Sequence, residues 1–188
     1  ARDTGAELTN YLTVWNGWYQ TLAPKLVQLV GHDHAVTDIS ILQNGALLAT
    51  CSSQGALRIW RTDDGQLVSD IAGVSKSSAN SGRTNPQSLL IQMPGYVAIH
   101  RYDGEVFVCN LGNTQDVWQV DSSAHVFTKV SASSSRPLLA VGTRDGDVTV
   151  WNVQTRQPLP ATLQLGGSIV DLEFSHDDRL LAACSTES

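Results

Sequence analysis

Long apolar runs, clusters of basic residues and N-glycosylation acceptors are all absent from this 188-residue sequence. No apolar run approaches the roughly 18 residues that a transmembrane helix needs, so we expect no membrane span. Lysine and arginine form no run or stripe, and the net charge of −6 repels phosphate backbones. We therefore expect no direct binding to nucleic acid.

Cysteine is scarce, and the three cysteines do not suit a disulfide framework. Cys51, Cys109 and Cys184 are odd in number and lie far apart in the sequence. No Asn-x-Ser/Thr acceptor accompanies them. Both absences favour a reducing intracellular compartment, either cytoplasmic or nuclear.

Signatures of catalysis and of cofactor binding are also missing. The sequence contains no phosphate-binding P-loop and no G-x-G-x-x-G motif leading into a helix. His32 and His34 flank Asp33, but no nearby residue is spaced to complete a zinc site. Ser175-His176-Asp177-Asp178 has the letters of a catalytic triad, yet residues adjacent in a tight turn cannot form the required chain of hydrogen bonds. The sequence thus predicts no enzyme, no cofactor and no metal site.

What the sequence does contain is an internal repeat. Four short alternating segments end at Trp15, Trp60, Cys109 and Trp151, which lie 45, 49 and 42 positions apart. This spacing matches the period of about 40 to 45 residues at which propeller blades recur, stretched once by an insertion.

Each repeat is built from short apolar segments that alternate at period two and are separated by turn residues, which indicates β-strands joined by hairpins. The predicted fold class is all-β, with units of four antiparallel strands. We expect whole units at 31–71, 88–120 and 125–164, and partial units at 1–30 and 166–188. The polar segment 72–87 is predicted to be a flexible insertion, with a phosphorylated or partner-ordered loop as the functional alternative.

The terminal residues of the repeats resemble a known family. Gly31-His32 followed by Trp60, together with Trp15-Asn16 and Trp151-Asn152, is similar to the GH...WD framework of WD40-repeat β-propellers. The resemblance implies that a His, a Ser or Thr, a turn Asp and the Trp hydrogen-bond to one another within a blade. No copy keeps the full set, since Gln54 stands at the turn position of the copy at 31–71. The residues expected to be structural are His32, Thr50, Trp60, Asp145 and Trp151.

The resemblance also bears on the size of the ring. Rings of this family typically have seven blades, which makes residues 1–188 part of a larger propeller. Alternatively, the two partial blades join into one composite blade and close a four-bladed ring.

The predicted function follows from the resemblance and from the missing chemistry. Loops on a rigid scaffold usually carry binding, and Arg and Tyr are enriched at binding hot spots. We therefore expect a scaffold that binds other proteins through Arg101, Tyr102, Arg144 and His34. The alternative is a sensor or regulatory propeller attached to a larger switch protein or enzyme. A catalytic propeller would need several converging groups, and the chain offers His34, Asp103 and Asp145 at best.

Overall fold

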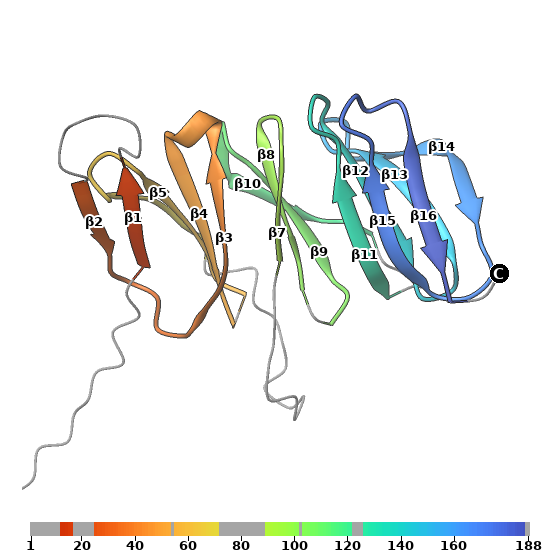
Figure 1. Cartoon of the computed structure of the whole chain (residues 1–188), viewed down its shortest axis with the longest axis horizontal. Helices are drawn as coiled ribbons and strands as arrows, with labels where there is room; N and C mark the ends of the chain where they lie inside the picture. Colours follow the sequence, from red (N-terminus) through yellow and green to blue (C-terminus); the bar gives the residue numbers. More distant parts are fainter. Residues whose placement is uncertain are drawn as a thin grey trace, which may run out of the picture. The chain divides into compact units, whose positions relative to one another are not determined.

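The computed structural model describes residues 12–16, 25–53, 55–71, 89–101, 103–121 and 126–186. Within these ranges the chain forms β-strands and one short 3₁₀ turn, η1 (Gln43–Gly45), and no α-helix (Figure 1). The all-β prediction is confirmed. None of the described segments is a helix long and apolar enough to span a membrane. The expected insertion at 72–87 and the predicted contact residue Tyr102 lie outside the described residues.

The chain divides into two compact units, residues 1–86 and 87–188, which are described separately. The first unit contains a two-stranded antiparallel sheet and a four-stranded antiparallel meander in the order β3-β4-β5-β6. The strands are β1 (Leu12–Asn16), β2 (Lys25–Leu29), β3 (Val36–Leu42), β4 (Leu47–Ser52), β5 (Leu57–Arg61) and β6 (Leu67–Ile71).

The second unit repeats this pattern with two four-stranded meanders and one two-stranded sheet. The first meander comprises β7 (Leu89–Met93), β8 (Tyr96–His100), β9 (Val106–Asn110) and β10 (Asn113–Gln119). The second comprises β11 (Phe127–Ala132), β12 (Leu138–Thr143), β13 (Asp147–Asn152) and β14 (Gln157–Gln164). The two-stranded sheet is formed by β15 (Ile169–Phe174) and β16 (Leu181–Ser185).

Burial falls from the second strand of each meander to the fourth. Residues of β4 and β12 are almost uniformly buried, because these strands are covered on both faces. Every residue of β14 is exposed, and this outer strand carries Pro158 and Pro160. Proline has no N–H to offer an incoming strand, so the two prolines protect this edge against further pairing.

Tight turns hold the strands in register. In the turn between β12 and β13, Gly146 has a φ of +93°, and a Cβ at this position would lie 1.8 Å from the Leu165 carbonyl oxygen. Only glycine fits both the left-handed backbone and this close approach.

Each unit has its own apolar core. In the first unit Val27 and Leu29 of β2 pack against Leu48 and Trp60 of the adjacent meander. The second unit has two clusters, one built around the valines of β9 with Phe127 and Leu139, and one in which β15 packs on Ala140 and Val148. The sheets are therefore stacked face to face within each unit, as the blades of a propeller are.

Candidate functional site

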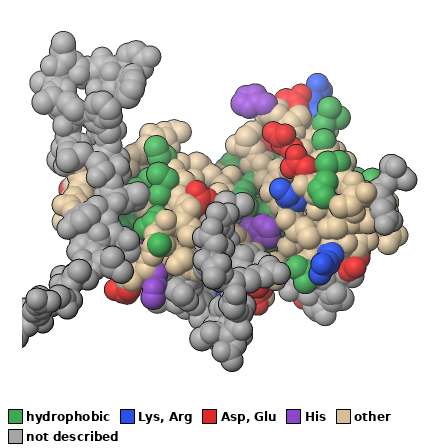
Figure 2. All heavy atoms as spheres, turned by 60° about the horizontal axis from the view of Figure 1, so that its bottom comes forward, with side chains coloured by type: hydrophobic (Ala, Val, Ile, Leu, Met, Phe, Trp, Pro, Cys, Tyr) green, Lys and Arg blue, Asp and Glu red, His purple; other side chains and the backbone are tan. Residues whose placement is uncertain are grey.

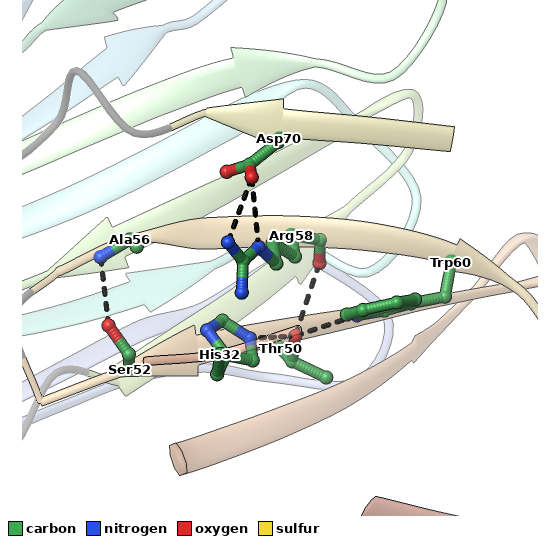
Figure 3. Close-up of polar contacts among 7 residues, drawn as sticks. All are labelled: His32, Thr50, Ser52, Ala56, Arg58, Trp60 and Asp70. Atoms are coloured by element: carbon green, nitrogen blue, oxygen red, sulfur yellow. Dashed lines mark hydrogen bonds and ion pairs between the residues drawn. The ribbon is translucent and has the colours of Figure 1, made fainter. Parts of the chain in front are cut away.

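A buried polar network ties the strands of the first meander together (Figure 3). His32 Nε2 lies 2.6 Å from Thr50 Oγ1, and Trp60 Nε1 donates to the same oxygen at 2.8 Å. All three side chains are buried. The hydroxyl on β4 thus joins the imidazole that precedes β3 to the indole on β5, and the structure brings together the three residues that the resemblance grouped.

An arginine on β5 and an aspartate on β6 form an ion pair beside this network (Figure 3). Arg58 Nε and Nη2 donate to one carboxylate oxygen of Asp70 on β6, at 3.0 and 2.9 Å. The third guanidinium nitrogen, Nη1, is buried and has no hydrogen-bond partner among the described residues. Figure 3 shows the Arg58 guanidinium above the His32 ring. Sequence reasoning missed this pair, whose only signal is an Arg and an Asp opposite each other on paired strands.

The surroundings of His32 favour its neutral form. The pKa of His32 is lowered from 6.5 to about 4, first by burial and then by the nearby Arg58 guanidinium, while Asp70 and Asp33 act in the opposite direction. The imidazole is therefore uncharged at neutral pH. Gly31 leaves room for the arrangement, because a Cβ there would lie 3.2 Å from Trp60 Cη2 and 3.3 Å from Arg58 Nη1.

Two of the predicted contact residues are exposed on loops. His34 lies in the connection from β2 to β3, and Arg144 lies in the turn between β12 and β13. A hydrogen bond closes the turn that carries Arg144, because Thr143 Oγ1 accepts from the Asp147 backbone N–H at 3.0 Å. Asp145, expected to be structural, is exposed in the same turn.

Arg101 differs from the expectation that it contacts a partner. Its side chain is only 2% exposed and pairs with Asp103 and Glu105, each at 2.8 Å. Its guanidinium also lies 5.8 Å from the centre of the Phe107 ring. These three partners hold the guanidinium inside the turn between β8 and β9. We therefore no longer expect Arg101 to contact a binding partner.

Trp151 belongs to a partly buried aromatic pair. It packs against the valine-rich core of the second unit, and its ring centre lies 6.2 Å from that of Trp118. The Arg156 guanidinium lies 5.9 Å from the Trp118 ring centre and pairs with Asp116. These contacts join β10 to β13 and to the turn between β13 and β14.

Asp178 fastens the β15–β16 turn to the preceding sheet. Its carboxylate accepts hydrogen bonds from the backbone N–H groups of Ser134 and Ser135, at 3.1 and 2.9 Å, and from the Ser135 hydroxyl. These bonds hold its pKa well below the usual range. The triad-like letters at Ser175 to Asp178 thus form a turn anchored to a distant loop, and no local pattern reveals partners 43 residues away.

On the face shown in Figure 2, acidic and basic side chains of the described residues are interspersed. Among the same residues, no three His, Cys, Asp or Glu side chains gather as the ligands of a metal ion do.

Comparisons with known proteins agree with this geometry. The family model "WD domain, G-beta repeat" matches residues 24–61 and 105–152. Protein HIR1 of Mycosarcoma maydis is 24% identical over 96% of this chain and 19% of its own length, and the COMPASS component SWD3 of Saccharomyces cerevisiae is 26% identical over 65% and 40%. The crystal structure of the Cps50 (Swd1) β-propeller domain of Myceliophteria thermophila superposes with a TM-score of 0.64 at 16% identity, covering 86% of this chain and 53% of that one. The chain thus spans less than half the length of HIR1 and of SWD3, and it forms a partial propeller.

Proposed function

Because this chain belongs to the WD40-repeat family, we propose that it is a non-catalytic scaffold that binds other proteins through its exposed loops. WD40 propellers generally serve as such scaffolds. One relative, SWD3, is named as a component of the COMPASS complex. A role as a complex subunit inside the cell is part of the proposal, and the three free cysteines support a reducing compartment.

The observation that carries the proposal is an exposed Arg144 on a rigid support. The residue follows directly on β12, which is buried almost throughout, and the Thr143 hydroxyl closes its turn. A fixed backbone lowers the entropy that a loop loses on binding, and arginine is among the residues enriched at hot spots. His34 offers a second exposed contact on the first unit.

The test is affinity capture with the 188-residue chain as bait. Wild type, Arg144→Ala and His34→Ala are compared with Arg179→Ala, which changes an exposed arginine in the β15–β16 turn. We expect captured proteins to be lost or reduced with Arg144→Ala and retained with Arg179→Ala. Equal capture by both arginine variants would remove Arg144 from the proposed surface. Folded wild-type protein that captures nothing specific would refute the scaffold proposal.

A sensor or regulatory propeller within a larger protein is the second candidate. The observation in its favour is that the segment of HIR1 that matches this chain is only 19% of that protein. A change in the activity of an attached domain on ligand binding to the propeller would support it, whereas capture that depends on Arg144 alone favours the scaffold.

A further inference from the structure

Two hairpin turns, one in each unit, are equivalent. In the β5–β6 turn and in the β13–β14 turn, the backbone N–H groups of Thr62 and Val153 donate to the carbonyl oxygen of the residue just before the second strand of the sheet, at 3.1 and 2.9 Å. Three residues after each donor the backbone is left-handed, with a φ of +74° at Gly65 and +59° at Arg156. Arg156 therefore stands where the equivalent turn has a glycine.

Arg156 is an exception to the residue preference of such positions. A left-handed backbone costs free energy for any residue with a Cβ, so glycine is the usual choice, as at Gly65. A Cβ at Gly65 would collide with Val27 Cγ1 on β2 of the neighbouring sheet. Arg156 instead reaches β10 of its own neighbouring sheet, where its guanidinium lies 5.9 Å from the Trp118 ring centre and pairs with Asp116. The residue that strains this turn is thus the one that meets an aromatic face and a carboxylate.

Trp118 and Asp116 have the chemistry of a site for a guanidinium group. Trp118 is held in place, because it packs on the core cluster of the second unit and on Trp151, with ring centres 6.2 Å apart and planes 47° apart. The face of an indole attracts cations more strongly than the other aromatic rings do. A guanidinium stacks flat on such a face and forms charge-assisted hydrogen bonds to a carboxylate beside it. The chain's own Arg156 occupies this site.

Arg156 occupies the site loosely. Its side chain is 47% exposed, and that of Asp116 is 30% exposed. The Arg101 guanidinium, which also lies by an aromatic ring and pairs with carboxylates, is only 2% exposed. Exposed ion pairs and exposed cation–π contacts are weak, because water competes for both partners. An arginine from outside the chain can therefore take the place of Arg156, whereas Arg101 is enclosed by its own turn.

We propose that Trp118 and Asp116 form a subsite for an arginine side chain of a partner protein, and that Arg156 occupies this subsite when no partner is bound. The partner's guanidinium stacks on the indole and pairs with the carboxylate, while Arg156 turns out into solvent. The subsite rests on the proposed function in that its partner is a protein. It is nevertheless separate from Arg144, because their turns lie at opposite ends of β13, whose six residues span about 20 Å.

The experiment measures the binding of a short peptide to the full 188-residue chain. The probe is acetyl-Gly-Arg-Gly-amide, the same peptide with lysine in place of arginine is the comparison, and the indole N–H resonance of Trp118 reports binding. Wild type is compared with Arg156→Gly, which removes the occupant and installs the residue of the equivalent turn. Arg156→Asn is a second variant, because asparagine also tolerates a left-handed backbone. Arg179→Ala, which changes an exposed arginine in the β15–β16 turn, is the matched control.

We expect both Arg156 variants to keep the β-sheet circular dichroism and to bind the arginine peptide about 3- to 30-fold more tightly than wild type. The apparent affinity of wild type is reduced by the fraction of molecules in which the weakly held Arg156 occupies the subsite. Arg179→Ala should bind as wild type does. The lysine peptide should bind more weakly, because an ammonium group does not stack on the indole. Adding Asp116→Asn to Arg156→Gly should remove most of the gain, since the carboxylate is then missing.

Three results would overturn the proposal. Folded Arg156 variants that bind no more tightly than wild type would show that Arg156 does not cover a subsite. Equal binding of the two peptides would show that the site does not select a guanidinium. Variants that lose stability and bind neither peptide would show that Arg156 only fastens the two sheets together. Because no partner protein is present in this assay, its failure is distinct from a failure of affinity capture through Arg144.

Discussion

The hydroxyl of Thr50 is the centre of the network in the first unit, and Thr50→Val removes it while preserving the shape of the side chain. His32 Nε2, at 2.6 Å, and Trp60 Nε1, at 2.8 Å, then both lose their partner. Both are buried, and each buried polar group left unsatisfied costs about 1 to 3 kcal/mol. Since a small relaxation can recover part of this, we expect the free energy of unfolding to fall by about 2 to 4 kcal/mol.

The assay is urea unfolding followed by tryptophan fluorescence. Thr50→Val is expected to lower the midpoint without changing the slope, because the same surface is exposed on unfolding. Thr162→Val, an exposed position on the edge strand β14, is the matched control and is expected to change the free energy of unfolding by less than about 0.5 kcal/mol. Equal effects of the two substitutions would refute the reasoning, since they would show that the Thr50 hydroxyl carries no network.

Three further predictions concern single residues. The folded pKa of His32, about 4, lies below its unfolded value of 6.5. The stabilisation from the neutral ring, at most about 3 kcal/mol, is therefore fully present above pH 6.5 and is lost as the pH falls toward 4. The free energy of unfolding of a His32→Gln variant should depend less on pH over the same range, and an unchanged pH profile would contradict the low pKa of His32. Gly31→Ala should lower the melting temperature, at a cost of about 1 kcal/mol, because the added Cβ meets Trp60 at 3.2 Å; a neutral result would mean that the indole shifts freely. Arg101→Met should destabilise the second unit by about 1 to 3 kcal/mol in urea unfolding, because the buried guanidinium is held by two carboxylates. Capture of partner proteins should be unchanged, and reduced capture by a fully folded variant would restore Arg101 to the contact surface.

The strands were predictable because their signals are local. Alternation at period two, turn residues between the alternating runs and the recurring Trp fix the class of the fold, and they depend only on neighbours in the sequence. The link between Thr50, His32 and Trp60 came from the family resemblance, which carries information about distant contacts. The Arg58–Asp70 pair and the Asp178 anchor were not predictable. Arg58 and Asp70 are 12 residues apart, and Asp178 lies 43 residues from Ser135, so the packing of the strands decides whether these partners meet.

The two arginines predicted as contacts show where a local signal was overlooked. Arg101-Tyr102-Asp103-Gly104 and Thr143-Arg144-Asp145-Gly146 align on their Asp-Gly pairs, so Arg101 corresponds to Thr143 and not to Arg144. The structure bears out this equivalence, because the backbone N–H of each turn glycine donates to the carbonyl of Arg101 and of Thr143, respectively.

This position is the last residue of β12 in one turn and the residue just after β8 in the other, and its side chain is buried in both. There the Thr143 hydroxyl accepts a hydrogen bond from the backbone, and at the same position in the other turn the Arg101 guanidinium binds Asp103 and Glu105. In the turn between β12 and β13 the next residue, Arg144, is exposed. An arginine in such a hairpin turn is therefore exposed or buried according to one step along the chain, and aligning the turns on Asp-Gly separates the two cases from the sequence alone.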